Sequence, residues 1–224
     1  MYDYNITKSV IAQTSESQRV YFTPDGNFPS VTTILGKTAN NVWLQRWKDR
    51  VGEEEAARIS KAATDRGEIV HKYLERFWDG SNSVYEDLQL EEPVTKKMIL
   101  NLIDATKVGI TKVWAQEIPV WSKQLRYAGR VDMFGEWKGV PSVIDFKTSK
   151  KKKQAKDIKD YFIQCTAYAC AHNEMFGTDL KKIVVLITVE NSEVQVFESV
   201  SLPFIPELKY RVLQYEKIFQ SNNL

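Results

Sequence analysis

The stretch Gly129–Ser149 reads GRVDMFGEWKGVPSVIDFKTS and carries aspartates and a lysine whose spacing could perform chemistry. Alternate side chains share one face of a strand, so Asp145 and Lys147 point the same way while Phe146 faces the opposite layer. Glycines and a proline between two apolar runs predict a hairpin-like reversal, which brings Asp132 to face Asp145 across a ladder. Because adjacent carboxylates repel each other, we expect a hard divalent cation such as Mg2+ or Mn2+ between them.

A third carboxylate lies upstream in the apolar run Lys112–Trp121, KVWAQEIPVW, which is typical of a strand. Its Glu117 is set among apolar neighbours and is a candidate third metal ligand. An exposed ion pair on an edge strand is the alternative interpretation of Asp145 and Lys147. Their apolar flanks favour the metal site, because charged groups that enter the edge of a core need compensation.

These motifs resemble the core of the PD-(D/E)XK nuclease superfamily, and they do so at Glu117, at Gly129 with Asp132, and at Ile144–Lys147. Further similarity is to the RecB-like exonuclease branch, whose helical histidine motif matches Arg66, Gly67 and His71. Several motifs in one order are more specific than any one alone, and the resemblance covers most of the chain. The order along the chain is that of the branch: His71, Glu117, Asp132, Asp145, Lys147, Gln164 and Tyr168.

Two further segments, Pro29–Leu35 (PSVTTIL) and Leu44–Trp47 (LQRW), are similar to the mitochondrial genome maintenance exonucleases and their phage and bacterial relatives. This resemblance implies a metal-dependent exonuclease that favours single-stranded DNA ends and acts in DNA replication, recombination or repair. It also implies a mixed α/β fold of the restriction-endonuclease type. In that fold a central mixed sheet is flanked by helices, here with an N-terminal hairpin and a helical extension.

Hydrolysis of a phosphodiester needs a nucleophilic water, stabilisation of charge on the phosphorus oxygens and help for the leaving alkoxide. One or two Mg2+ ions can serve all three needs, and Mn2+ is expected to substitute. We expect Lys147 to hold the attacking water or the scissile phosphate, as a base or as a clamp. The expected metal ligands are Asp132, Asp145, Glu117, His71 and the backbone carbonyl of Phe146.

The formal net charge is only +2, so affinity for a polyanion must come from locally placed charge. A lysine run that starts at Lys150 adjoins the candidate metal site and suits a phosphate-backbone track, although most such runs are solvated loops. Residues one turn apart on the helix that follows predict a polar stripe along a cleft edge, the alternative being a half-buried core tyrosine. The expected DNA contacts are Arg66, Thr148, Ser149, Lys150, Lys151, Lys152, Tyr161, Gln164 and Tyr168.

The 224 residues, 43% of them hydrophobic, can bury one substantial core, so we expect a single nuclease domain over residues 1–224. Within it, residues 1–80 hold a hairpin and a helical part that contributes His71. Residues 108–200 form the catalytic core with the order αβββαβ, and residues 204–224 form a terminal helix. The hairpin is expected near Val20–Val31, outside the nuclease core, and Gly67 is expected to separate two helices.

Cysteine usage and the opening residues restrict cofactor and compartment. Cys165 and Cys170 lie five apart on one predicted helix and suit small core residues, and two cysteines cannot supply a four-cysteine iron–sulfur cluster, so none is expected. Neither a signal peptide nor a membrane-length apolar run is evident, and the opening MYDYNITKSV lacks the arginines of a transit peptide. We therefore expect a cytoplasmic protein of a microbe or a virus, with no membrane partner.

Two other classes of function stay open. A structure- or sequence-specific endonuclease would share the metal site, and a circular single strand would discriminate it from an exonuclease. A non-catalytic nucleic-acid-binding module could retain the fold, although the intact acidic and lysine positions count against it. Aromatic residues could stack on bases, but helical spacing of tryptophans is more often core packing; the candidates are Tyr21, Phe22, Trp43 and Trp47.

Overall fold

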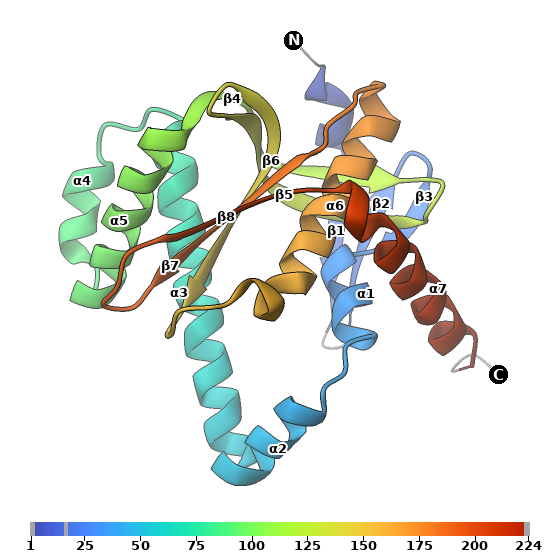
Figure 1. The fold of residues 1–224 in the computed structure, drawn as a ribbon, viewed down its shortest axis with the longest axis horizontal. Coiled ribbons are helices and arrows are strands. Elements are labelled where there is room, and N and C mark those ends of the chain that lie inside the picture. Colours follow the sequence, from blue (N-terminus) through green and yellow to red (C-terminus); the bar gives the residue numbers. More distant parts are fainter. Residues whose placement is uncertain (1–2, 16–17, 222–224) are drawn as a thin grey trace.

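Five strands form the central sheet of the computed structural model, which describes residues 3–15 and 18–221. Their order across the sheet is the order along the chain, from β4 to β8 (Figure 1). The β6–β7 pair is parallel and the other three pairs are antiparallel, so the sheet is mixed. The strands are β4 (Ile110–Ser122), β5 (Tyr127–Trp137), β6 (Val140–Ser149), β7 (Lys182–Val189) and β8 (Gln195–Val200).

The parallel pair requires a crossover connection, and α6 (Lys159–Phe176) supplies it. Gly177 follows this helix with a φ of 62°, the left-handed conformation in which glycine commonly ends a helix. A helix over the segment that carries Gln164 and Tyr168 was predicted from the sequence and is confirmed.

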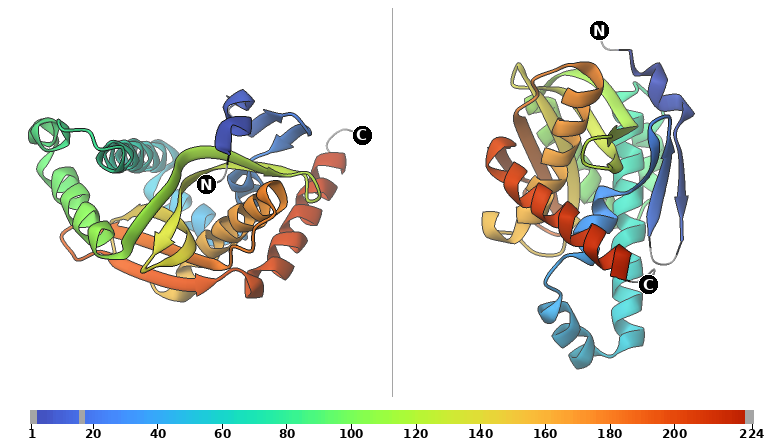
Figure 2. Two further views of the ribbon diagram at one scale, coloured as in Figure 1. Left: turned by 90° about the horizontal axis from the view of Figure 1, so that it is seen from above. Right: turned by 90° about the vertical axis from the view of Figure 1, so that its right-hand side faces the viewer.

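Helices cover both faces of the sheet (Figure 2). On one face, α3 (Glu53–Trp78) and α5 (Pro93–Gly109) pack on a cluster that includes Phe146. On the other face, α6 packs with α1 (Val31–Lys37) and α7 (Ile205–Ser221). The prediction of a mixed sheet flanked by helices is confirmed, as is the predicted helix at the end of the chain.

A separate three-stranded sheet lies near the N-terminus, where the hairpin was predicted. It is formed by β1 (Ile11–Thr14), β2 (Arg19–Thr23) and β3 (Gly26–Pro29). This sheet is docked on the central sheet: Ser30 bridges Ala128 of β5, and the Trp121 indole donates to Asp25 Oδ2 at 2.9 Å. The hairpin is thus outside the five-stranded sheet but held firmly against it.

The helical region before the sheet differs from the prediction in one respect. α3 runs without interruption through Gly67, so the expected boundary there is wrong. A glycine inside a helix costs only about 1 kcal/mol relative to alanine, which the packing of a long helix outweighs. The break lies instead at Gly52, whose φ of 87° ends α2 (Val42–Val51).

The remaining regular segments are short. The connection between α3 and α5 contains two of them, a helical turn and a 3-10 turn. Among the described residues, each helix is too short or too polar to cross a bilayer. The short segments are η1 (Tyr4–Ser9), α4 (Val84–Asp87), η2 (Leu88–Leu90), η3 (Ala155–Ile158) and η4 (Leu202–Phe204).

A close contact between β5 and α6 explains why the motif begins with a glycine. A Cβ atom built on Gly129 would lie 2.6 Å from Cε1 of Tyr168, well inside van der Waals contact. Tyr168 is buried, and Gln164 Nε2 donates to its hydroxyl at 3.1 Å, so the ring has little freedom to move. The absence of a side chain at Gly129 therefore lets α6 approach β5.

We predict that Gly129→Ala lowers the free energy of unfolding by about 1–3 kcal/mol, because the added methyl overpacks this contact. Urea denaturation of the purified protein measures the change. Gly36→Ala is the matched control, since a Cβ there meets nothing within 4 Å. Equal stability of the two variants would contradict the role assigned to Gly129.

Candidate active site

The β5–β6 ladder ends at the pair Met133–Ile144, one residue before the two aspartates would meet. Beyond this pair, Asp132 Oδ2 accepts a hydrogen bond from the Phe146 backbone N–H at 2.8 Å. The expectation that Asp132 and Asp145 face each other as a ladder pair is therefore wrong. The strands separate because β6 stays paired with β7 as far as Ser149, whereas β5 stays paired with β4.

Glu117 lies in an irregular stretch of β4. Its neighbours Gln116 and Ile118 pair with Met133 and Val131, which places Glu117 opposite Asp132. Its φ of 50° is in the left-handed region, which costs a residue other than glycine about 1–2 kcal/mol. Backbone strain of this kind is concentrated at functional sites, where the surrounding structure holds it in place.

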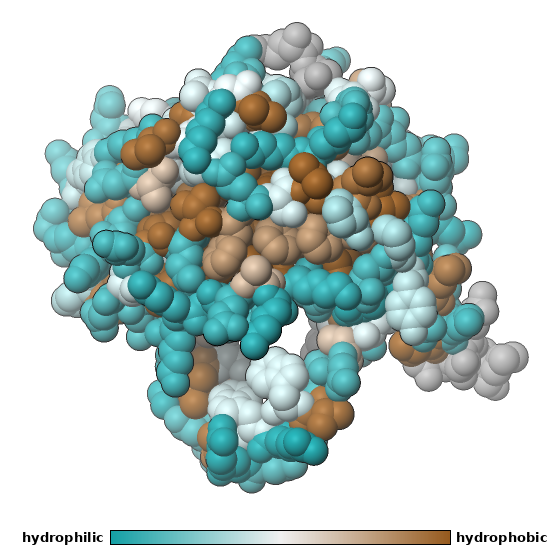
Figure 3. Space-filling view, viewed as in Figure 1, coloured by the Kyte–Doolittle hydropathy of each residue, from teal (hydrophilic) through white to brown (hydrophobic). Residues whose placement is uncertain are grey.

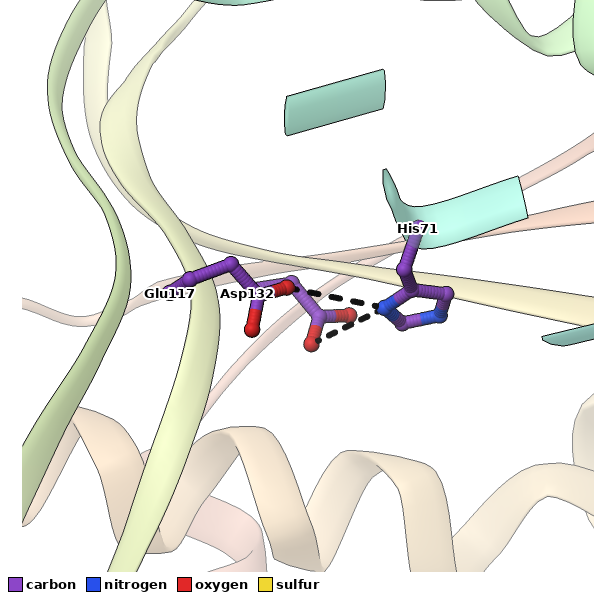
Figure 4. Close-up of side chains that lie close together, drawn as sticks. All are labelled: His71, Glu117 and Asp132. Atoms are coloured by element: carbon purple, nitrogen blue, oxygen red, sulfur yellow. Dashed lines mark ion pairs between the residues drawn. The ribbon is translucent and has the colours of Figure 1, made fainter. Parts of the chain in front are cut away.

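His71 approaches the two carboxylates from the middle of α3 (Figure 4). Its Nδ1 lies 3.5 Å from Asp132 Oδ1 and 3.8 Å from Glu117 Oε1. Its Nε2 lies 2.9 Å from the Phe146 carbonyl oxygen, which can only accept, so Nε2 carries a proton. This hydrogen bond orients the ring and leaves Nδ1 as the nitrogen that faces the carboxylates.

His71 and Asp132 shift each other's pKa in opposite directions. Burial lowers the pKa of His71, but Asp132 and Glu117 outweigh this effect and raise it to about 10. Burial raises the pKa of Asp132, but His71 and Lys147 outweigh it and lower the value to about 2. At neutral pH the histidine is therefore an imidazolium that neutralises part of the acidic charge.

The side chains of His71, Glu117 and Asp132 can each offer one ligand atom, and these atoms all lie within 4.8 Å of one another. Ligand atoms about 2.1 Å from Mg2+ lie within roughly 4 Å of one another, so a small inward shift of these side chains would let them converge on a single small cation. The two carboxylates suit Mg2+ or Mn2+, whereas the imidazole is a ligand more typical of transition metals.

Asp145 is arranged differently from the other expected ligands. Its side chain is fully buried, and its Oδ1 accepts from Lys147 Nζ at 2.6 Å and from Gln164 Nε2 at 3.3 Å. Its Oδ2 also lies 2.6 Å from Nζ as an ion pair, without a hydrogen bond of good geometry. Asp145 is therefore outside the set of ligand atoms that converge among the described residues, and metal binding by Asp145 stays a prediction.

Protonation sets Asp145 apart as well. Burial raises its pKa to about 7 against the lowering effect of Lys147, and the nearby Asp132 adds to the rise. Burial lowers the pKa of Lys147, but Asp145 and Asp132 outweigh it and raise the value well above its usual range. Lys147 Nζ also lies 5.3 Å from the ring centroid of the half-buried Tyr161. The lysine is thus a fixed positive charge at neutral pH.

Gln164 and Tyr168 are largely buried, with 8% and 2% of their surfaces exposed, because α6 packs most of its circumference in the core. Both residues nevertheless line the same pocket as His71, Asp132 and Lys147. Gln164 Nε2 donates both to Asp145 Oδ1 and to the Tyr168 hydroxyl, so the two residues help to hold the Asp145 carboxylate in place. Contact with DNA stays a prediction for these residues.

The other expected DNA contacts lie where β6 ends. Lys150, Lys151 and Lys152 are exposed, and Thr148 and Ser149 are partly exposed beside them. Arg66 is ion-paired with Glu190, which follows β7. The structure thus brings the lysines to the surface next to Lys147, whereas the guanidinium of Arg66 is already partnered.

His71, Glu117, Asp132 and Lys147 all line one pocket of about 190 Å³. Part of the lining was not predicted from the sequence. Arg130 lies on the same face of β5 as Asp132 and pairs with Glu117 at 2.8 Å, so strand alternation could have identified it. The sequence pattern does not identify the lining residues that come from the N-terminal hairpin, because they reach the pocket only through tertiary docking. The lining residues are Arg19, Tyr21, Ser30, Thr32, His71, Glu117, Gly129, Arg130, Asp132, Lys147, Gln164 and Tyr168.

Three curated proteins that this chain resembles in sequence share one name. Mitochondrial genome maintenance exonuclease 1 of Xenopus tropicalis is 32% identical over 157 residues, which are 66% of this chain and 44% of that protein. The Mus musculus protein of the same name is 32% identical over 155 residues, covering 66% of this chain and 45% of its own. The Homo sapiens protein is 29% identical over 153 residues, covering 65% of this chain and 44% of its own.

A solved structure of a putative exonuclease from Eubacterium rectale is 13% identical, covers 68% of each chain and has a TM-score of 0.43. The chain spans less than half the length of the curated relatives that it matches.

The expectation of a cytoplasmic protein from a microbe or a virus is wrong. It rested on the lack of a targeting segment, and the curated relatives that match are mitochondrial genome maintenance exonucleases of animals. Because the matched segment is less than half of each relative, its composition carries no information on compartment.

The model of the PD-(D/E)XK nuclease superfamily matches residues 43–203, a range that contains His71, Glu117, Asp132, Asp145 and Lys147. The same range holds the five-stranded sheet, α3, α5 and α6. With the mixed sheet and the converging acidic residues, this match leads to one conclusion: the chain belongs to the PD-(D/E)XK nuclease superfamily.

Proposed function

We propose that this chain is a metal-dependent exonuclease that hydrolyses phosphodiester bonds at the ends of single-stranded DNA. The observation that carries the proposal is the convergence of His71, Glu117 and Asp132 beside Lys147 in one pocket. The names of the curated relatives support exonuclease activity and a role in genome maintenance.

The proposed metal is Mg2+, with Mn2+ able to replace it. His71 through Nδ1, Glu117 and Asp132 would hold it, and Asp145 is a further proposed ligand once its contact with Lys147 loosens. When bound, such an ion lowers the pKa of a water and stabilises negative charge on phosphate oxygens. The Phe146 backbone serves this site by orienting both His71 and Asp132.

Lys147 is proposed as a phosphate clamp and not as a base. Its raised pKa keeps the ammonium charged, so it can donate to a phosphate oxygen but cannot accept a proton from water. Its exposed fraction of 19% leaves the ammonium accessible from the pocket. A charge held in a partly desolvated site stabilises a developing anion more strongly than it would in water.

The preference for a single strand is supported by α2, which projects from the body with α3 (Figure 1). α2 buries none of its residues, and Trp43 is 69% exposed. In the space-filling view the projection is set off from the body by a hollow (Figure 3). A groove of about 750 Å³ on α2 combines aromatic faces with guanidinium groups and is lined by Asn40, Val42, Trp43, Arg46, Trp47 and Arg50. Such a surface can stack bases and contact phosphates.

Asp132→Asn should reduce cleavage of an end-labelled linear single strand by about 100-fold or more, because a proposed metal ligand is lost. The assay compares Mg2+ with EDTA and includes a circular single strand. Asp179→Asn, a surface position with 76% of its side chain exposed, is the matched control. Cutting of the circle would show an endonuclease, and full activity in EDTA would refute the metal-dependent mechanism.

Metal binding should release about one proton, because Nδ1 of His71 carries a proton at neutral pH and must lose it to become a ligand. We therefore expect the apparent affinity for Mn2+ to rise about tenfold per pH unit between pH 6.5 and 8.5. Calorimetry in two buffers of different ionisation enthalpy counts the protons released. A pH-independent affinity would show that His71 is not a ligand.

The raised pKa of His71 also predicts how the stability of the metal-free protein depends on pH. The pKa of His71 is about 10 in the folded state and near 6.5 when unfolded, so its protonation stabilises the fold fully below pH 6.5. This contribution is lost as the pH rises through 10. Denaturation of the metal-free protein should show the loss, and His71→Gln should lack it.

Trp43→Ala should weaken binding of a single-stranded oligonucleotide by about 1–3 kcal/mol while thermal stability stays unchanged, because the side chain is exposed and available for stacking. Fluorescence anisotropy measures the affinity. Tyr210→Ala, which removes an exposed aromatic from α7, is the control. Equal affinities of both variants and the wild type would exclude stacking on α2.

A further inference from the structure

The wall of the pocket that faces the proposed metal ligands comes from the N-terminal sheet. Arg19 and Tyr21 of β2, together with Thr32 at the start of α1, line the same pocket as His71 and Lys147. Buried residues of both sheets pack together where the N-terminal sheet docks, so this wall is fixed in place. A cationic side chain is therefore held in the wall of the candidate catalytic pocket.

Arg19 differs from the other cations of the pocket in its partners. Arg130 is paired with Glu117 and Lys147 with Asp145, so their charges are compensated within the protein. Among residues 3–15 and 18–221, no ion pair involves the guanidinium of Arg19, and its Nε is buried without a hydrogen-bond partner. A buried donor without an acceptor is unfavourable, and an anionic oxygen from a ligand would satisfy it.

Local packing fixes the orientation of the Arg19 side chain. The guanidinium carbon lies 5.3 Å from the ring centroid of Tyr21, and the Arg19 backbone N–H donates to Thr33 Oγ1 at 3.1 Å. Burial raises the pKa of Tyr21, and Arg19 and Arg130 partly oppose the rise. Both guanidiniums are thus within electrostatic reach of the Tyr21 hydroxyl, which lies in the pocket wall.

We propose that Arg19, with the exposed Thr32 hydroxyl on the same wall, binds a second phosphate of the strand, next to the phosphate held at the metal site. This proposal rests on the proposed nuclease function, because a second phosphate within one pocket implies a nucleic-acid strand. The planar guanidinium can donate two parallel hydrogen bonds to one phosphate. Two attachment points fix the path of the strand across the pocket, which a single metal-bound phosphate would not.

The test uses single-stranded oligonucleotides in which one phosphate at a time is replaced by a neutral methylphosphonate, at successive positions from the labelled end. Binding is measured by fluorescence anisotropy with Ca2+, and cleavage is measured separately with Mg2+. The proteins are the wild type, Arg19→Ala, Arg19→Lys and Lys181→Ala. The last variant is the control, because it removes an exposed lysine paired with Asp179. Circular dichroism establishes that each variant is folded.

We expect one replaced position to weaken binding to the wild type by about tenfold, as for the loss of one charge-assisted contact. Arg19→Ala should bind the unmodified strand about tenfold more weakly and be insensitive to replacement at that position. Arg19→Lys should retain part of the sensitivity, since the charge remains and the planar fork is lost. Lys181→Ala should behave as the wild type.

Equal sensitivity of wild type and both Arg19 variants at every position would overturn the proposal. If Arg19→Ala is unfolded, the proposal is tested by comparing the sensitivity of Arg19→Lys to phosphate replacement with that of the wild type. Failure of the wild type to cleave the unmodified strand with Mg2+ would refute the proposed nuclease function. The binding series would still decide whether Arg19 contacts a phosphate, so the two failures are distinguishable.

Discussion

The peptide groups on either side of Phe146 hold the active site together. Its N–H donates to Asp132 and its carbonyl accepts from His71, so one residue of β6 positions side chains from β5 and α3. The Phe146 side chain is buried in the cluster between the sheet and α3. Because a packed aromatic ring anchors this backbone, displacement of the core on that face would move both polar contacts at once.

Separation of β5 and β6 creates the space in which these contacts form. In a continuous ladder, the N–H of Phe146 would be used in strand pairing and could not reach a side chain. The end of the ladder at Met133–Ile144 frees it, and the left-handed backbone at Glu117 turns a third polar group toward the same point. A left-handed backbone and the end of a ladder thus coincide at the point where the charged side chains converge.

Period-two alternation was sufficient to predict that Asp145 and Lys147 share a face opposite Phe146. The contacts confirm it, since Phe146 packs in the cluster under α3 while Asp145 bonds to Lys147 and to Gln164 of α6 on the other face. The end of α6 at Gly177 was also predictable, because a glycine after an apolar run commonly ends a helix. The boundary expected at Gly67 failed because packing along a long helix overrides weak local propensity.

Other features depend on tertiary structure alone. The point at which β5 leaves β6 is decided by competition between two neighbouring strands, and neither strand's own sequence reports it. Arg19 lies far from the catalytic motifs along the chain and reaches the pocket only because the N-terminal sheet docks through Ser30. The position of Arg19 in the pocket cannot be predicted from sequence periodicity, since it depends on how the two sheets pack against each other.

The projecting helix α2 contributes no buried side chain to the fold. Stability therefore restricts its exposed residues only weakly, although Leu44 and Trp47 are half-buried. Substrate handling could diverge there through single substitutions without a cost to folding. For protein engineering, the same feature makes α2 a site where recognition can be redesigned independently of the catalytic chemistry.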